Sequence, residues 1–138
     1  MTNPIVLIVG TRPEGIKMIP LYFFFLLRNI PTVIVSTAQH SELLQEVYEL
    51  FGITPDYNLN VMKPNQDLFH ITCDVLTKTK ELFNKINPKM VAVQGDTTSS
   101  MAAALAAFYL EIPVCHVEAG LRTYDMSSPF PEEMNRQF

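Results

Sequence analysis

Apolar runs rich in β-branched residues alternate along this chain with segments of helical periodicity. The runs, which we predict to be strands, are residues 5–9 (IVLIV), 32–37 (TVIVST), 90–95 (MVAVQG) and 113–120 (PVCHVEAG). Strands without polar alternation are typical of parallel sheets whose two faces are both covered by helices. The sequence therefore predicts an α/β fold built on one parallel sheet.

Helical patterns fill the intervals between the predicted strands. One helix is expected to begin near Pro13, and the others to span residues 41–51, 66–87 and 97–110. In the second helix, the spacing i, i+4, i+7, i+8 assigns the buried face to Leu43, Val47, Leu50 and Phe51. In the third, one stripe contains Leu68, Ile71, Val75, Leu82 and Ile86. Residues 53–65, with their Pro and Asn punctuation, are expected to form an extended connection.

Length and composition narrow the possible functions. The chain has 138 residues, of which 48% are hydrophobic and 17% charged, and this suits one folded domain. Its net charge of −4 and its lack of Lys/Arg runs argue against binding to nucleic acid or to an anionic membrane surface. The longest apolar stretch, MIPLYFFFLL, is about half as long as a membrane-spanning helix.

The two cysteines bear on the compartment. Cys73 and Cys115 lie far apart in apolar settings, without a CxxC motif or a His/Cys cluster. We expect both to be buried reduced thiols rather than parts of a disulfide or a metal site. The start of the chain, MTNPIVLIVG, lacks the basic segment and the cleavage site of a signal peptide. These features favour a cytoplasmic protein that is neither exported nor membrane-spanning.

Polar clusters follow each predicted strand. They are GTRPEGIK, TAQHSE, GDTTSS and EAGLRT, in chain order. The carboxyl ends of parallel strands lie along one edge of their sheet, and ligands of such sheets bind there. The four clusters are therefore expected to form one site.

The first cluster places cations where a helix begins. Arg12 and Lys17 flank the expected start at Pro13, although the positive end of a helix disfavours cations. Their position becomes reasonable if an anion such as phosphate binds there, since the first N–H groups of a helix also attract anions. A plain strand–turn–helix is the alternative. Neither the GxGxxG pattern of dinucleotide sites nor the GxxxxGK[ST] phosphate loop is present, so a nicotinamide or simple ATP site is disfavoured.

Carboxylates stand out in the later clusters. Asp96 can be an N-cap of the helix that follows, a role that Thr97 can also fill. Glu118 lies near the end of an apolar strand, so it must be near water, paired with a cation, or raised in pKa. The stiff segment SPFPEE holds Glu132 and Glu133, which belong either to a site or to a solvated loop.

At this point the residues resemble a family. The segments GTRPEGIKMIP, QGDTTSSMAAALAAFYLEIPVCHVEAGLRT and SPFPEEMNRQ closely resemble the bacterial and archaeal UDP-N-acetylglucosamine 2-epimerases of the non-hydrolysing type. The resemblance implies the first, Rossmann-like half of a GT-B-type two-domain fold. It also implies interconversion of UDP-N-acetylglucosamine and UDP-N-acetylmannosamine, through elimination and re-addition of UDP, for surface polysaccharide synthesis. It implies no cofactor and no metal.

The resemblance also assigns roles to individual residues. The positions that match the family's catalytic carboxylates are Asp96, Glu118 and Glu132. Arg12 and Lys17 match its cationic pair for the nucleotide sugar. Supporting roles in substrate binding are implied for His116, Arg122 and Arg136. Which carboxylate acts on which proton is left open.

Three departures from the family pattern are visible. Family members are much longer, so we expect residues 1–138 to be an incomplete N-terminal domain without the C-terminal nucleotide-binding domain, inactive alone, and homodimeric in the full-length protein. Some members have a regulatory site. Of its residues, Gln39 and His40 are retained here, whereas Glu42 and Asn65 stand where those members have a glutamine and an arginine. We therefore expect no such regulation.

The third departure is the run Phe23–Phe24–Phe25. Successive residues of a helix are separated by about 100°, so at least one ring should lie off the sheet-facing stripe, at an interface or on an unusually wide buried face. For the function, two alternatives are kept: a hydrolysing epimerase that releases N-acetylmannosamine and UDP, and a non-catalytic truncated homologue.

Overall fold

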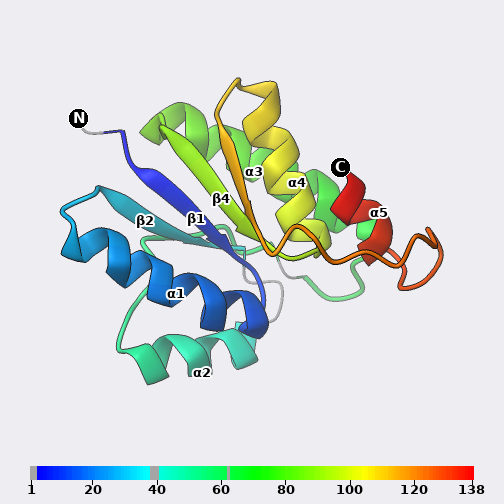
Figure 1. Cartoon of the computed structure of the whole chain (residues 1–138), viewed down its shortest axis with the longest axis horizontal. Coiled ribbons are helices and arrows are strands. Elements are labelled where there is room, and N and C mark those ends of the chain that lie inside the picture. Colours follow the sequence, from blue (N-terminus) through cyan, green and yellow to red (C-terminus); the bar gives the residue numbers. More distant parts are fainter. Residues whose placement is uncertain (1–2, 38–40, 62) are drawn as a thin grey trace.

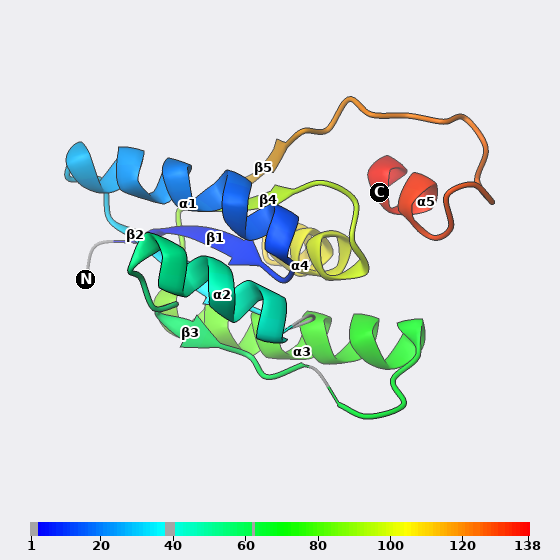
Figure 2. The same cartoon turned by 90° about the horizontal axis from the view of Figure 1, so that it is seen from below.

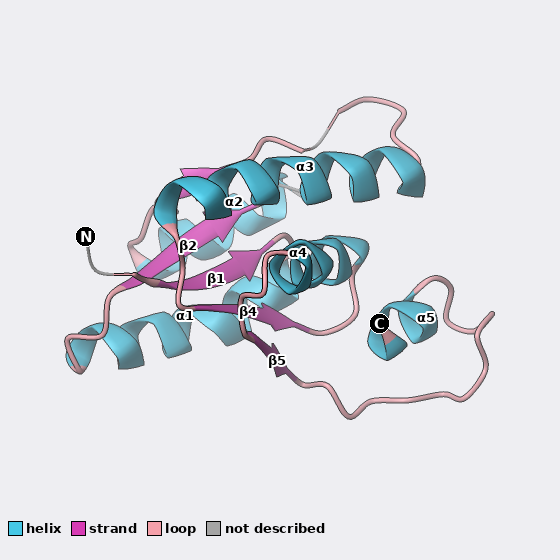
Figure 3. Cartoon of the chain, turned by 90° about the horizontal axis from the view of Figure 1, so that it is seen from above, coloured by secondary structure: helices cyan, strands magenta, loops and turns pink. Residues whose placement is uncertain are grey.

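The computed structural model describes residues 3–37, 41–61 and 63–138, and within them the predicted parallel sheet is present. Its strands are β1 (Ile5–Val9), β2 (Thr32–Ser36), β3 (Tyr57–Asn58), β4 (Met90–Gln94) and β5 (Val114–Val117). They are all parallel and lie in the order β3-β2-β1-β4-β5, as Figure 3 shows for most of the sheet. The α/β fold class is confirmed. The short strand β3 lies in the connection expected to be merely extended.

Helices cover both faces of the sheet (Figures 1 and 2). One face carries α1 (Arg12–Leu27) and α2 (Ser41–Phe51), and the other carries α3 (Leu68–Ile86) and α4 (Thr98–Tyr109). The last helix, α5 (Glu132–Gln137), lies beyond the carboxyl ends of the strands, after a long loop (Figure 3). The arrangement leaves that edge of the sheet open between α1, α4 and α5.

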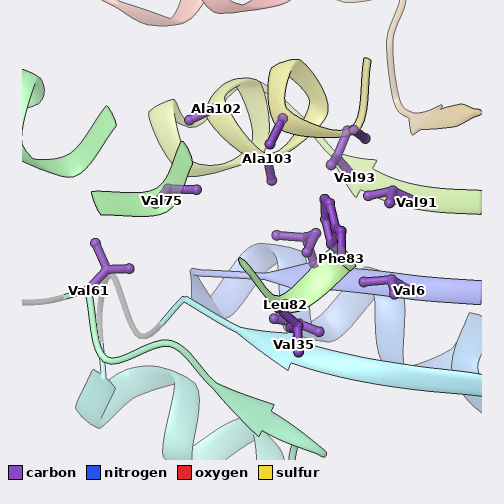
Figure 4. Close-up of a cluster of buried hydrophobic side chains, with 13 residues drawn as sticks. Val6, Val35, Val61, Val75, Leu82, Phe83, Val91, Val93, Ala102 and Ala103 are labelled. Carbon is purple, nitrogen blue, oxygen red and sulfur yellow. The ribbon is translucent and has the colours of Figure 1, made fainter. Parts of the chain in front are cut away.

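The core has two layers because alternate strand residues point to opposite faces. In β1, Val6 and Ile8 pack with side chains of α3 and α4, of which Phe83 is the largest fully buried one (Figure 4). Leu7 and Val9 face the other way, against α1 and α2. The middle strand is therefore buried throughout, as its uninterrupted apolar sequence predicted.

The predicted buried face of α2 is confirmed for Val47 and Phe51 and wrong for Leu43 and Leu50. Leu43 and Leu50 are 48% and 79% exposed, whereas Leu44, Val47 and Tyr48 are buried. Both sets follow helical spacing, and the choice between them is made by packing, since Leu44 and Val47 lie directly against Gly15 of α1. A side chain larger than hydrogen at position 15 would collide with them.

Helix α3 occupies the predicted range with small differences in its buried face. Asp67 caps its start, and Asn87, in a left-handed conformation, ends it. Leu68 is 37% exposed, whereas Thr79 and Phe83, which lie outside the predicted stripe, are buried. The hydroxyl of Thr79 donates to the carbonyl of Val75, so its burial leaves no polar group unpaired.

The three phenylalanines of α1 separate as predicted. Phe23 packs against Phe51 of α2, with ring centroids 6.5 Å apart, and Phe25 also packs against the core. Phe24 points outward and is 46% exposed, and the Arg28 guanidinium stacks 3.7 Å from its ring centroid. At least one of the rings thus lies off the sheet-facing stripe.

The prediction that both cysteines are buried is wrong. Cys73 and Cys115 are both free and exposed. Cys73 lies on the side of α3 that faces an apolar groove, and Cys115 lies on β5, an edge strand that no helix covers completely. An apolar sequence around a cysteine does not reveal that its strand is at the edge. None of the helices in the described residues is long and apolar enough to cross a membrane.

Candidate functional site

A cavity of about 180 Å³ opens at the carboxyl ends of the strands. Three of the four polar clusters contribute to it, and the lining residues are Thr11, Pro13, Glu14, Lys17, Gln94, Gly95, Asp96, Thr97 and Glu118. The remaining cluster, after β2, includes Gln39 and His40, which lie outside the described residues. The shared sheet edge thus brings Lys17, Asp96 and Glu118 together from positions up to 101 residues apart.

The start of α1 already satisfies part of its own backbone. Thr11 is the N-cap, and its backbone N–H and that of Gly10 both donate to the Glu14 carboxylate. Pro13 has no N–H to offer. Anion binding at this helix start therefore depends on side chains more than on free backbone groups. Arg12 is suited to it, because its side chain is exposed and has no ion-pair partner within residues 3–37, 41–61 and 63–138.

Glu118 meets two of the three conditions set by its sequence position. It follows β5 with a left-handed backbone (φ 61°), and its side chain is 44% exposed. Its Oε2 accepts hydrogen bonds from Lys17 Nζ and Gln94 Nε2. The bond from Lys17 is the main cause that holds the pKa of Glu118 below its ordinary value of 4.5. The carboxylate is near water and paired, so at neutral pH it is ionised and able to accept a proton.

Asp96 does not cap the helix that follows it. The cap is Thr97, whose Oγ1 accepts from the Ser100 N–H at 3.1 Å. The Asp96 carboxylate is turned instead toward Arg136 of α5 and forms an ion pair with it. The Arg136 side chain is only 7% exposed, so it is held in place by this pair rather than free in solvent.

His116 and Arg122 hold neighbouring parts of the chain in place around the site. The ring of His116 bonds through Nε2 to the Gly95 carbonyl at 2.5 Å, and because a carbonyl only accepts, Nε2 carries the proton. That bond fixes the turn at Gly95, where φ is 71°. Arg122 pairs with Glu133 at 2.8 Å and does not line the cavity.

Glu133, which the sequence indicated only as part of a motif, holds together the segment that follows β5, residues 118–138, which we call the C-terminal arm. It is completely buried, and its two oxygens accept from the N–H groups of Thr123 and Tyr124 and from the guanidinium groups of Arg122 and Arg136. These bonds, led by that from the Thr123 N–H, lower its pKa to about 2. The pair with Arg136 has the i,i+3 spacing of helix neighbours, whereas the pair with Arg122, 11 residues away, was not predictable from local spacing.

Glu132 lies at the first position of α5 and does not line the cavity. Its Oε2 is buried and has no hydrogen-bond partner in the described part of the chain. The neighbouring helix residue Asn135 donates to the Asp96 carbonyl at 2.8 Å, so α5 itself lies against the site.

The signal for one further site residue was present but unused. Residues 11–14 (TRPE) have the Thr-x-x-Glu spacing of a capping box, and both of its bonds form. Glu14 lines the cavity with only 2% of its surface exposed, and burial raises its pKa above 4.5 against the opposing effect of its hydrogen bonds. The spacing indicates the cap, but not the contacts across the sheet.

The remaining candidates are the residues of the regulatory pattern and possible metal ligands. Glu42 and Asn65, the two departures from the regulatory pattern, are both exposed. In the described residues, no group of three or more His, Cys, Asp or Glu side chains is arranged to hold a metal ion.

Comparison with known proteins agrees with the resemblance in the motifs. Residues 27–138 match the sequence profile of a family described as UDP-N-acetylglucosamine 2-epimerase. The chain is 51% identical over 138 residues to the UDP-N-acetylglucosamine 2-epimerase of Salmonella borreze, covering 98% of this chain and 36% of that protein. It is 52% identical over 132 residues to the enzyme of the same name from Escherichia coli K12, covering 94% of this chain and 35% of that protein.

A solved structure matches equally closely. The UDP-GlcNAc 2-epimerase from Neisseria meningitidis, bound to UDP-GlcNAc, superposes with a TM-score of 0.90 at 47% identity, over 97% of this chain and 37% of that one. The chain thus spans little more than a third of the length of these relatives. Sequence profile, identity and fold agree, and the chain belongs to the UDP-N-acetylglucosamine 2-epimerase family.

Proposed function

We propose that this chain supplies one wall of the active site of an enzyme that inverts C2 of UDP-N-acetylglucosamine to give UDP-N-acetylmannosamine. The observation that carries the proposal is the single cavity that joins Lys17, Asp96 and Glu118. The Neisseria relative binds UDP-GlcNAc, and it shares this fold over almost the whole chain. Because the chain covers about a third of its relatives, the complete activity belongs to a longer protein.

The reaction explains why such a site needs both signs of charge. The C2 proton of the sugar is not acidic, so its removal must accompany cleavage of the C1–O bond to UDP. A carboxylate takes the proton, the C2–H electrons form the C1=C2 bond of a 2-acetamidoglucal, and UDP leaves with the C1–O electron pair. UDP then adds back to C1 while a proton is delivered to the opposite face of C2.

The described residues suit these steps. Glu118 is ionised, partly exposed and able to accept a proton, and Asp96 lies in the same cavity, with Glu132 as a third carboxylate on α5. The guanidinium of Arg12, which has no ion-pair partner among the described residues, can offset the charge of the departing diphosphate. Lys17 must exchange its bond with Glu118 for one with the substrate, which would release that carboxylate for proton transfer.

An NMR titration of the isotope-labelled chain tests the binding half of the proposal. With UDP-GlcNAc or UDP, we expect amide shifts at residues 10–17, 95–97 and 118, with weak affinity because one wall of a site binds less than a closed one. Uridine, which lacks the diphosphate, is the matched control and should leave the Arg12 loop unshifted. Shifts confined to other surfaces would overturn the proposal.

Product analysis tests the chemical half. The chain alone should form no UDP-N-acetylmannosamine, and detectable turnover by it would refute that expectation. A longer protein that contains this segment should convert UDP-GlcNAc to UDP-N-acetylmannosamine. Release of free N-acetylmannosamine and UDP would instead identify a hydrolysing enzyme, and absence of any product a non-catalytic homologue.

A further inference from the structure

Glu14 connects two loops that are far apart in the sequence. Its Oε2 accepts from the N–H groups of Gly10 (2.5 Å) and Thr11 (3.0 Å), in the turn between β1 and α1. Its Oε1 accepts from the hydroxyls of Thr97 (2.7 Å) and Ser100 (3.0 Å), at the start of α4. A single buried side chain therefore joins the amino-terminal turns of two helices, across 83 and 86 residues of sequence.

The same contacts continue toward the other carboxylate of the cavity. The Ser100 hydroxyl also lies 2.9 Å from the Gln94 carbonyl, and the Gln94 side chain donates to Glu118. One helical turn after Glu14, Lys17 pairs with that same Glu118. The two loops are thus connected by the buried contacts of Glu14 and again by the more exposed contacts of Glu118.

The turn that Glu14 holds is closely packed. Gly10 approaches the Thr37 hydroxyl and Glu14 so closely that a methyl group on Gly10 would collide with Thr37. A carboxylate that is buried without a cation costs free energy, and it is retained here with four hydrogen bonds from neutral groups. Such an expensive arrangement is more than a helix cap requires.

We propose that Glu14 is a positioning residue: it holds the start of α1, which carries Arg12 and Lys17, against the loop that carries Asp96, so that cations and carboxylate face one bound substrate. The inference rests on the proposed function for the identity of the ligand. The bridge itself is a property of the chain without ligand.

Asp67 provides a matched control, because its side chain caps the start of α3 as the Thr11–Glu14 capping box caps the start of α1. Its carboxylate accepts from the His70 N–H at 2.8 Å and pairs with the His70 ring, so these contacts stay within its own helix. Replacing Asp67 removes a helix cap without removing a bridge between loops. A merely structural role for Glu14 predicts that both replacements act alike.

The chemistry at Glu14 also separates the bridge from the charge. In Glu14→Gln, the amide oxygen can still accept from Gly10 and Thr11, and the amide NH₂ can donate to the Thr97 and Ser100 hydroxyls, which accept as well as donate. Glu14→Asp keeps the charge but is one methylene shorter, so it cannot reach both loops. Bridging therefore predicts that Gln restores what Asp loses.

The experiment is the UDP-GlcNAc titration, repeated on four variants of the chain. We expect Glu14→Asp to raise Kd about tenfold, Ser100→Ala to raise it about threefold, and Glu14→Gln and Asp67→Ala to stay within about twofold of the unaltered chain. Wild-type affinity in Glu14→Asp would overturn the proposal. So would an equal loss in Glu14→Gln, since charge rather than the bridge would then matter. If Glu14→Asp fails to fold, Ser100→Ala, which keeps the α1 cap, decides by the same criterion.

A readout without ligand separates failure of this inference from failure of the proposed function. In Glu14→Asp, the amides of residues 95–98 should shift and exchange their hydrogens faster, although the substitution lies on α1. In Asp67→Ala they should not change. If the unaltered chain does not bind UDP-GlcNAc, the binding half of the proposed function fails, and these amides still test the bridge. Unchanged amides at 95–98 in Glu14→Asp would overturn it.

Discussion

Two buried carboxylates organise two regions of this molecule, and they are held in opposite ways. Glu14, at the start of α1, and Glu133, in the C-terminal arm, are each almost or completely buried and each accept four hydrogen bonds. The donors to Glu14 are two backbone amides and two hydroxyls, all neutral. The donors to Glu133 are two backbone amides and two guanidinium groups, which belong to Arg122 and Arg136.

The difference shows what compensates a buried charge. Burial raises the pKa of Glu14 because neutral donors offset the loss of water only partly. Glu133 has its pKa lowered to about 2, chiefly because the Thr123 N–H donates to it, with further contributions from Arg122 and the Tyr124 N–H. Four hydrogen bonds therefore do not by themselves decide the pKa of a buried carboxylate. The balance between the donors and the loss of water decides it.

Exchanging each carboxylate for its amide gives the sharpest contrast. In Glu133→Gln, the new NH₂ must face either Arg122 and the Tyr124 N–H or Arg136 and the Thr123 N–H, and none of these can accept a hydrogen bond. We expect its Tm to fall by on the order of 10 °C, because Arg122 also loses its ion-pair partner and Arg136 keeps only its pair with Asp96. In Glu14→Gln the hydroxyls can accept, and Tm should change by only a few degrees, about 3 °C. Thermal unfolding followed by circular dichroism measures both, and equal losses would contradict the contrast.

The pH dependence of stability should have opposite signs at the two positions. Glu133 contributes its full stability above pH 4.5 and loses it as the pH falls toward about 2. The raised pKa of Glu14 means that its ionisation costs stability, and this cost grows as the pH rises above 4.5. The free energy of unfolding, measured by denaturant titration at several pH values, should therefore diverge from the Gln variants in opposite directions. Parallel differences would show that the donors do not decide.

A smaller effect is expected at the exposed carboxylate of the site. Glu118 is paired with a cation as Glu133 is, but it lies near water. In Lys17→Ala, the Glu118 pKa should return toward 4.5, since the bond from Lys17 is the main cause of its depression. Carbon NMR of the Glu118 carboxyl group measures this directly, and UDP-GlcNAc should bind about threefold more weakly. A Glu118 pKa that stays low would show that the hydrogen bond from Gln94, and not that from Lys17, is the main cause of the lowered pKa.

The smallest change in stability is expected at Phe24, and it tests the packing of α1 apart from the hydrogen bonds at the start of that helix. Phe24 is half exposed on the outer face of the helix, away from Glu14. Phe24→Lys should change Tm by no more than about 2 °C. If this face is a subunit interface, the variant should become monomeric in light scattering where the unaltered chain is not. An unchanged oligomeric state would contradict a subunit interface at Phe24.

Fold class was predictable here because the strands are apolar throughout and the helices between them are amphipathic or apolar. The order of polar clusters then fixed which edge of the sheet holds the cavity. The face of α2 was not predictable, because Leu43 and Leu44 begin two overlapping stripes and only contact with Gly15 selects one. The exposure of Cys115 was not predictable either, since a central and an edge strand can have the same local sequence.

At the site, proximity was predictable but pairing was not. The motifs indicated Asp96 and Arg136 as site residues, but their ion pair joins positions 40 residues apart. Glu133 was passed over in favour of Glu132, because two adjacent glutamates on a short helix look alike until the arginines are placed. The Thr11–Glu14 spacing did indicate a cap, and its contact with Thr97 needed the sheet to bring the two loops together.

The two edge strands of the sheet differ in length, and this determines at which edge a further strand can pair. At one edge β3 has two paired residues, which offer little length to a further strand. At the other edge β5 has four residues, and one side of its backbone faces away from β4 with its N–H and C=O groups turned outward. Such a row is a template for pairing. A polypeptide that extends this sheet gains most by adding beside Val114–Val117, next to the strand whose end presents Glu118.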